Sequence, residues 1–367
     1  MLPFALVAST LNSGLVSASS YKPRASVCNG HAELCDRSYG NVTFIGSHDS
    51  YAISATQVAA NQDQNITTQL NDGVRMLQVQ AHSYDGSIHL CHTSCLLLDG
   101  GLFSDYLTEV NTWVVANPNE VLSILIVNSD NLNASMYGAV FETSGLDKVS
   151  YAPTKATTSV ADWPTLGSMI DSGLRVVTFM DNSADFTTVP YIIDEFSNVV
   201  EDAYNAVEDS FPCTANRSTG TPENQLVLTN HYLDQVGSST SIVTPNKSKL
   251  NQTNAETGTG SVGQGASNCF QIYARSPNFI LLDFYDAAGL APFNVAAELN
   301  DVSAPTNTVA NYTGGDGSTS TSTKSTASTT STSSSLSGAG PQFKSEMMPL
   351  IVAVAVAVMA GSGLMLA

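Results

Sequence analysis

Four of the six histidines fall within 45 residues, and two of them are placed where they could do acid–base chemistry. His48 follows an apolar run and precedes Asp49, and His92 lies at the end of the same stretch. Two imidazoles at one cavity can cleave a phosphodiester, because one takes the proton of the attacking hydroxyl or water and the other protonates the departing oxygen. A carboxylate bonded to each ring would fix its tautomer and raise its basicity, and Asp49 and Asp283 are the candidates.

A polar face is predicted on the segment between these histidines. Side chains alternate in direction along a strand, so Gln78, Gln80 and His82 share one side of residues 72–82, and Arg75 lies on the other. Buried polar groups need hydrogen-bond partners, so we expect the glutamine side to face a polar cavity and to bind substrate. Arg75 is expected to form a structural ion pair.

Two further polar residues close other predicted strands. Asn128 ends the apolar run 121–127, and His231 follows the run 225–230. Both are candidates for contacting substrate in the same pocket, and a purely structural role is the alternative for each.

The six cysteines indicate an oxidising, secretory route. Their spacing favours three local disulfides: Cys28–Cys35, Cys91–Cys95 and Cys213–Cys269. The second would close a five-residue ring around His92 and limit its freedom. A zinc site is the competing interpretation, but two C-x-x-C pairs are not present.

The body of the chain predicts strands that alternate with helices. Apolar runs typical of buried strands occupy residues 41–46, 74–81, 121–127, 174–180, 225–230 and 278–283. Helices are expected over 103–116, 136–145, 194–211 and 290–300, and a glycosylated surface loop over 236–268. This alternation over some 275 residues predicts an α/β fold of the TIM-like (β/α)₈ barrel type. His48 would then lie at the carboxyl face, where barrel active sites lie.

Three runs resemble a known family of phosphodiesterases. Residues 46–50, 69–75 and 90–92 resemble the catalytic X region of phosphatidylinositol-specific phospholipase C, and more closely its fungal secreted phospholipase C-like phosphodiesterases. The resemblance implies a barrel that is often imperfectly closed. It also implies that His48 is the general base and His92 the general acid, with Asp49 orienting His92 and Asp283 orienting His48.

The chain departs from this family at two positions. Bacterial members have Asp and Arg, and animal members have Ca²⁺-binding carboxylates, where this chain has Gln78 and Gln80. Neutral amides supply neither a guanidinium nor carboxylate ligands, although stabilisation of the developing charge is commonly the largest catalytic contribution. Amide N–H groups and a protonated His82 could donate in their place, which predicts that His82→Ala costs as much activity as loss of His48.

Three functions remain open at this point. The first is a metal-independent phosphoric diester hydrolase, with a phosphoinositide or another phospholipid as substrate and no cofactor. The second is a catalytically weak or inactive barrel that serves as a cell-surface binding or wall protein. The third is an enzyme that recruits a divalent ion through Asp49 and the histidines.

The two ends of the chain predict a cell-surface protein. Residues 1–18 resemble a secretory signal peptide, and residues 19–302 would form the barrel. Residues 303–338 form a Ser/Thr-rich stalk, and 339–367 read as a glycosylphosphatidylinositol (GPI) attachment signal that is removed, with attachment at Ser337 or Gly338. A transmembrane anchor is the alternative. Seven N-x-Ser/Thr sequons fit this route: Asn41, Asn65, Asn133, Asn216, Asn246, Asn251 and Asn311.

The amino-acid composition limits which kinds of molecule the protein is expected to bind. The chain has 13 Lys and Arg against 32 Asp and Glu among 367 residues, a formal charge of −19. Nucleic-acid binding needs clustered cations, so it is not expected. We expect an extracellular monomer that meets the membrane through its anchor and takes a phosphodiester or phospholipid substrate.

Overall fold

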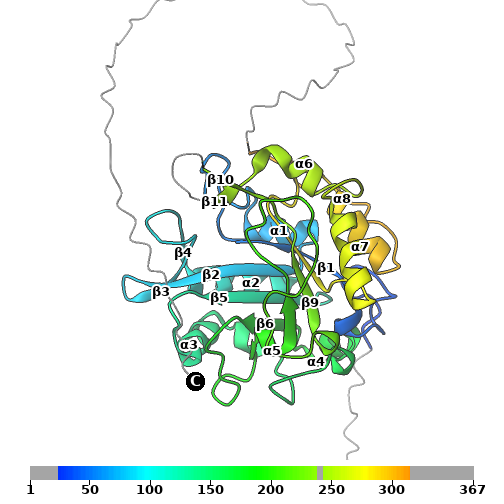
Figure 1. The fold of residues 1–367 in the computed structure, drawn as a ribbon. Coiled ribbons are helices and arrows are strands. Elements are labelled where there is room, and N and C mark those ends of the chain that lie inside the picture. The colour runs from blue at the N-terminus through cyan, green and yellow to red at the C-terminus, as the bar shows by residue number, and fades with distance from the viewer. Residues whose placement is uncertain (1–23, 238–242, 315–367) are drawn as a thin grey trace, which may run out of the picture. The chain divides into compact units, whose positions relative to one another are not determined.

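Eight parallel strands form an open barrel in the computed structural model, which describes residues 24–237 and 243–314 (Figure 1). Along the sheet their order is β7-β6-β5-β2-β1-β12-β9-β8. Their bounds are β1 (Phe44–Ser47), β2 (Met76–Tyr84), β5 (Leu122–Asn128), β6 (Val176–Met180), β7 (Ile192–Asp194), β8 (Val199–Glu201), β9 (Leu226–Asn230) and β12 (Phe279–Leu282). The end strands β7 and β8 are joined only by the short helix α5 (Glu195–Asn198). The predicted TIM-like barrel is therefore confirmed, and it is imperfectly closed.

Two antiparallel additions lie outside this barrel. Strand β2 continues past the barrel into a hairpin with β3 (Ser87–Cys91), which pairs in turn with β4 (Asp99–Leu102). A separate two-stranded sheet consists of β10 (Asp234–Val236) and β11 (Val243–Pro245).

Helices cover the outside of the sheet (Figure 1). The longer ones are α1 (Ile66–Asp72), α2 (Phe103–Ala116), α3 (Ala134–Ser144), α4 (Leu166–Ser172), α7 (Val262–Tyr273) and α8 (Ala291–Leu299). Shorter turns are α6 (Leu250–Thr253) and the 3₁₀ helices η1 (Tyr39–Asn41), η2 (Leu146–Val149), η3 (Val160–Asp162), η4 (Pro222–Asn224) and η5 (Lys247–Lys249). Within the described residues, none of these helices has the length and apolar character needed to cross a membrane.

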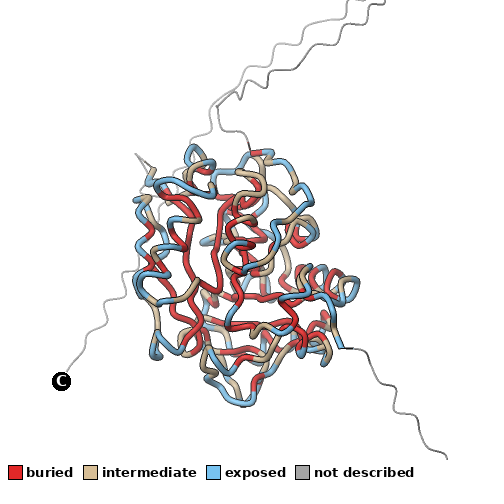
Figure 2. The backbone as a smooth tube through the Cα atoms, turned by 90° about the vertical axis from the view of Figure 1, so that its right-hand side faces the viewer, coloured by how far each residue is buried: buried red, intermediate tan, exposed pale blue. Residues whose placement is uncertain are grey.

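Buried residues occupy the inner segments of the chain, and exposed residues lie in the outer segments (Figure 2). Alternation along the strands builds two apolar layers. One set of side chains fills the barrel interior, and the next residue of each strand packs outward against helices, as expected for a parallel sheet covered on both faces. The interior set includes Phe44, Met76, Leu125, Phe179, Phe279 and Leu281. At Gly46 a Cβ atom would lie 2.6 Å from Leu281 Cδ2 and 2.9 Å from Met76 Cβ, so only glycine fits there. Gly46 is thus an interior position, and His48, two residues on, opens toward the same side.

Most predicted elements are found, and one helix is wrong. The six predicted strands correspond to β1, β2, β5, β6, β9 and β12, and the helix 103–116 has the bounds of α2. The helix predicted over 194–211 stops at Asn198, because Val199 and Val200 form β8 and pair with β9. Their β-branched side chains are buried between neighbours in the sheet, which overrides local helix preference. The predicted loop 236–268 contains β11, α6 and the start of α7.

All three predicted disulfides are present: Cys28–Cys35, Cys91–Cys95 and Cys213–Cys269. Arg75 forms the expected ion pair, with Nη2 2.8 Å from Glu120 Oε2. The predicted signal peptide, the predicted attachment signal and most of the predicted stalk lie outside the described residues. The described part of the predicted stalk, residues 303–314, contacts the barrel. Val309 and Tyr312 pack against its apolar core, and Thr313 Oγ1 donates to Asp63 Oδ2 at 2.9 Å.

Candidate active site

His48 is held by a buried network at the end of β1. Its Nδ1 lies 2.8 Å from Asp283 Oδ1, which also accepts from Asn61 Nδ2 at 3.0 Å. The ring of Tyr232 stacks on the imidazole, with centroids 3.8 Å apart and planes 4° apart. Because Asp283 is a carboxylate acceptor, Nδ1 carries a proton and Nε2 is left to face the cavity.

The carboxylates around His48 favour its charged form. Burial on its own would lower the pKa of His48, but Asp283 and then Asp49 outweigh it and raise the pKa to about 9. Burial, followed by the charge of Asp283, raises the pKa of the nearby Asp234 to about 7. A higher pKa makes the deprotonated ring a stronger proton acceptor, while it lowers the fraction of His48 that is deprotonated at neutral pH.

Asp49 lies between the two predicted catalytic histidines. Its Oδ2 is 3.8 Å from His48 Nε2 and 3.5 Å from His92 Nε2, and its side chain is buried. Both imidazoles thus turn the same nitrogen toward one oxygen. They line a single cavity of about 280 Å³, together with Gln78 and Gln80.

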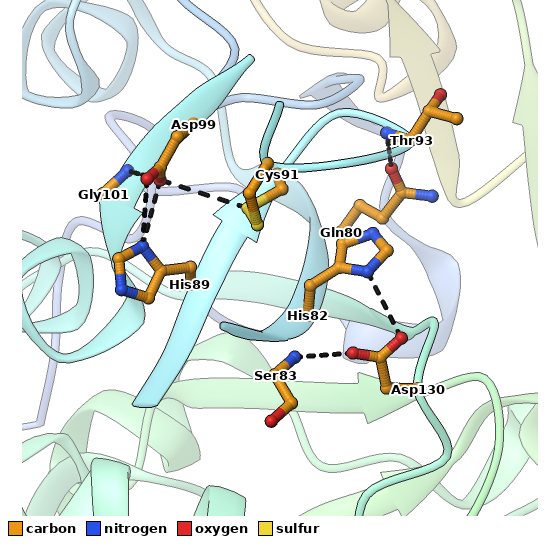
Figure 3. The surroundings of a disulfide bond; sticks show 10 residues. Gln80, His82, Ser83, His89, Cys91, Thr93, Asp99, Gly101 and Asp130 are labelled. Carbon is orange, nitrogen blue, oxygen red and sulfur yellow. Dashed lines mark hydrogen bonds and ion pairs between the residues drawn. A yellow bond between two sulfur atoms is a disulfide. The ribbon is translucent and has the colours of Figure 1, made fainter. Parts of the chain in front are cut away.

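His92 is held by a surface loop. It follows β3, and its backbone N–H donates to Leu98 O at 3.1 Å. The disulfide Cys91–Cys95 closes the loop around it, with Cα atoms 4.7 Å apart. Gln80 Oε1 accepts the backbone N–H of Thr93 at 2.6 Å, which ties the loop to the barrel (Figure 3).

Interior positions explain which polar residues reach the cavity. Side chains two positions apart on a strand point to the same side. A residue two positions after an apolar side chain of the barrel interior therefore also points into the barrel. Gln78 follows Met76 in this way, and Tyr232 belongs to the same series as Leu228 and Asn230 on β9. Strand ends at these positions carry polar groups into the cavity above an apolar interior.

Two predicted substrate contacts, Asn128 and His231, do not reach the cavity. Asn128 is fully buried on the outward side of β5, where its Oδ1 accepts from Tyr137 at 2.7 Å. His231 is also fully buried, and its Nε2 lies 3.0 Å from Thr253 O. Burial lowers the pKa of His231 to about 4, so it stays neutral. Both residues end strands as predicted, and these contacts favour the structural role that was the alternative for each.

His82 is also absent from the cavity lining. It lies beyond Ala81, the last residue of β2 that pairs with β5, and is therefore on the hairpin. Its Nδ1 is 3.3 Å from Asp130 Oδ1 (Figure 3). The neighbouring His89 is similarly occupied, with Nδ1 3.1 Å from Asp99 Oδ1. These imidazoles have structural partners on the hairpin.

An acidic cluster with one arginine also lines the cavity, and it was not predicted. Arg217 Nη2 lies 2.5 Å from Glu201 Oε1, and the guanidinium lies over the rings of Tyr204 and Phe196. Glu195 is buried beside this pair, and burial followed by the charge of Glu201 raises its pKa well above the usual range. The only sequence signal was the pair of acidic residues flanking 196–200, in the segment wrongly predicted as helix.

No cluster of three or more His, Cys, Asp or Glu side chains that could hold an ion occurs in the part of the chain that the structure describes. The arrangement offers two imidazoles, their carboxylates and neutral amides, which suits proton transfer at an anionic substrate.

Comparisons with known proteins identify a family and related chains. A family model described as PI-PLC X matches residues 34–300. A protein named PI-PLC X domain-containing protein 1 from Arthroderma benhamiae is 40% identical over 262 residues, which is 70% of this chain and 85% of that protein. An uncharacterized secreted protein of the same fungus is 41% identical over 285 residues, and the match spans 75% of this chain but 64% of that relative's length.

A solved structure has a similar fold. A double mutant of the phosphatidylinositol-specific phospholipase C from S. aureus aligns with a TM-score of 0.50 at 14% sequence identity. The alignment covers 74% of this chain and 94% of that chain.

Proposed function

The chain belongs to the PI-PLC X domain family, and from this premise we propose that it is a phospholipase C-like phosphodiesterase in which His48 and His92 act as base and acid. The observation that carries the proposal is that both Nε2 atoms face Asp49 Oδ2 across one cavity. General acid–base pairs need this convergence on a site where a reacting phosphorus atom can be placed.

In the proposed reaction, His48 Nε2 takes the proton of the attacking hydroxyl or water as its oxygen forms a bond to phosphorus. The bond from phosphorus to the leaving oxygen breaks, and His92 Nε2 gives that oxygen its proton. Asp283 holds the Nδ1 proton of His48 throughout, which stabilises the imidazolium that forms. Asp49 Oδ2 lies 3.5 Å from His92 Nε2 and orients the ring until the leaving oxygen takes its place.

The substrate we propose is a phospholipid with a polar head group. The S. aureus enzyme with a similar fold is named for phosphatidylinositol. In this chain, the Glu201–Arg217 pair and Asn230 lie in the same cavity, with Asn230 Nδ2 donating to Glu201 Oε1 at 2.7 Å. A carboxylate beside a guanidinium offers both an acceptor and donors to a head-group hydroxyl.

We also propose that the chain acts outside the cell, as a GPI-anchored monomer attached at Ser337 or Gly338. The three disulfides and the secreted relative support an extracellular location. The terminal sequence pattern supports the anchor.

The test is an assay of the purified full chain on phosphatidylinositol and on a generic phosphodiester, with and without a chelator, beside His48→Ala. Chelator-resistant turnover that His48→Ala abolishes is the expected result. Loss of turnover in chelator would favour recruitment of a divalent ion. Absence of turnover on both substrates would favour a binding or wall protein.

A further inference from the structure

Gln78 and Gln80 are hydrogen-bonded in the same way to the two loops that carry His48 and His92, here called the histidine loops. Gln78 Oε1 accepts the backbone N–H of Asp49 at 2.6 Å, and Gln80 Oε1 accepts that of Thr93 at 2.6 Å. Asp49 directly follows His48, and Thr93 directly follows His92. Each glutamine therefore holds the residue next to one imidazole.

The two residues held in this way have unusual backbones. Asp49 has φ 39° and Thr93 has φ 59°, both in the left-handed region. This conformation is costly for a β-branched residue such as Thr93, and it persists only where surrounding contacts enforce it. The glutamine carbonyls supply one such contact to each loop.

These bonds also decide which way each amide group points. A backbone N–H can only donate, so the side-chain atom that meets it must be the carbonyl oxygen, and the –NH₂ group lies on the other side. None of the hydrogen bonds found among the described residues uses Nε2 of Gln78 or Gln80, and both side chains line the cavity. Figure 3 shows the nitrogen of Gln80 turned away from Thr93.

Other buried glutamines of this barrel are arranged in the opposite sense. Gln62 Nε2 donates to the carbonyl oxygens of His48 and Leu282, at 2.8 and 2.9 Å. Gln69 Nε2 likewise donates to backbone carbonyls, and the Oε1 atoms of both residues lack partners. Only at the cavity is the oxygen used by the backbone while the amide hydrogens stay free, within the part of the chain that is described.

Free donors at this place meet a need of the site. The cavity is lined by the carboxyl groups of Asp49, Glu195, Glu201 and Asp234, and Arg217 is already paired with Glu201. An anionic phosphodiester entering this cavity needs hydrogen-bond donors that bring no further negative charge.

We propose that Gln78 and Gln80 form a neutral phosphoryl-oxygen site, in which each –NH₂ group donates to a non-bridging oxygen while each carbonyl holds one histidine loop. The proposal rests on the proposed function for its substrate, a phosphodiester. It assigns the charge-stabilising role to side chains that carry no charge and that the two histidine loops themselves orient.

The test compares Gln78→Glu and Gln80→Glu in the full chain. A Glu side chain keeps an oxygen for the backbone N–H but replaces the donating group by an anion. The matched control is Gln235→Glu, which adds the same charge at an exposed position of β10 outside the cavity lining. The probe is dimethyl phosphate, an unreactive phosphodiester, and its binding is followed by NMR of the histidine Cε1–H signals.

The expected result is that the wild-type chain and Gln235→Glu bind the probe alike, while each cavity variant binds it at least about tenfold more weakly at neutral pH. Binding should recover at about pH 5, as the introduced carboxyl becomes protonated and can donate. Where the wild-type chain turns over a diester, the cavity variants should lose about 10²-fold in kcat/KM. Cavity variants that bind the probe as the wild type does, or a control that loses as much as they do, would overturn the proposal.

A second pair of variants tests the other half of the proposal, that each glutamine carbonyl holds one histidine loop in position. Gln78→Met and Gln80→Met remove the oxygen as well, so the backbone N–H of Asp49 or Thr93 should exchange with solvent faster than in the corresponding Glu variant. Equal exchange in the Met and Glu variants would overturn this half.

The two proposals can fail separately. A wild-type chain that binds the probe through Gln78 and Gln80 yet cleaves no diester would contradict the proposed function alone. A chain that cleaves diesters equally well with Glu at both positions would contradict this inference alone.

Discussion

The two histidines reach the same cavity by different means. His48 is held by buried side chains: a carboxylate on Nδ1, an amide on that carboxylate and a stacked tyrosine ring. His92 belongs to a surface loop whose shape comes from a disulfide, a left-handed residue and one bond from Gln80. Both imidazoles are nevertheless equally accessible, each with 14% of its side chain exposed.

The two histidines therefore differ in what their surroundings control: nearby charges control the protonation of His48, and a covalent ring controls the position of His92. A buried carboxylate network favours the charged form of His48 and raises its pKa. The loop around His92 sets a position, because a five-residue ring leaves few conformations to its members. Perturbing each support should therefore change a different observable, and four predictions test this.

The largest effect is expected from removing either imidazole. His48→Ala and His92→Ala should each lower kcat by about 10²- to 10⁴-fold, because each removes one proton transfer from the rate-limiting step. The double variant should lose little more than the worse single variant, since a base and an acid that act together are not additive. Steady-state rates of the three variants measure this, and losses that multiply would show independent roles.

A smaller loss with a shift in pH dependence is expected from Asp283→Asn. In the wild type, one limb of the pH profile of kcat/KM should lie near pH 9, the pKa to which the carboxylates raise His48. A carboxylate stabilises the imidazolium, so its removal lowers the pKa of His48 and moves that limb to lower pH. The rate should fall about 10- to 100-fold. A limb that stays in place would remove Asp283 from its assigned role.

A moderate loss is expected from opening the His92 loop by Cys91→Ser with Cys95→Ser. We expect kcat to fall about tenfold with the pH limb of His48 unchanged, because only the position of His92 is affected. The matched control is Cys28→Ser with Cys35→Ser, whose loop is similarly short and lies outside the cavity lining. Both pairs should cost about 2 kcal/mol of unfolding free energy, so denaturant melts separate stability from activity. An equal fall of kcat in the control would contradict the positioning role.

The smallest effect is expected from the hairpin histidine. His82→Ala should change kcat less than about twofold, because its ring is occupied by Asp130 and lies outside the cavity lining. This reverses the expectation drawn from the sequence. A loss as large as that of His48→Ala would return His82 to the site.

The fold and the two histidine loops could be predicted because they depend on local patterns. Buried parallel strands read as short apolar runs, and His48 and His92 follow such runs directly. The spacing of Cys91 and Cys95 was sufficient to predict the loop that holds His92. Candidate catalytic residues at the ends of strands can be predicted from a sequence when their residue type is rare, as histidine is here, and when the preceding strand is recognised.

The remainder of the site depends on which side of its strand a residue lies and on contacts between separate segments of the chain. Asn128 and His231 end strands as predicted, but each belongs to the outward series of its strand. Counting by twos from Leu125 or Leu228, which pack inside the barrel, would have excluded both. Glu201 of the Glu201–Arg217 pair lies in the segment that was wrongly predicted as helix. The orientation of the two glutamine amides depends on backbone groups of Asp49 and Thr93, which lie outside β2.

The assigned roles are tested most directly by changing the leaving group of the substrate. A nitrophenyl phosphodiester departs without needing a proton, whereas an alkyl leaving group must be protonated as it departs. His92→Ala should therefore recover to within about tenfold of the wild type on the nitrophenyl substrate, and His48→Ala should stay inactive on both. Recovery of His48→Ala in place of His92→Ala, or of neither variant, would contradict the account.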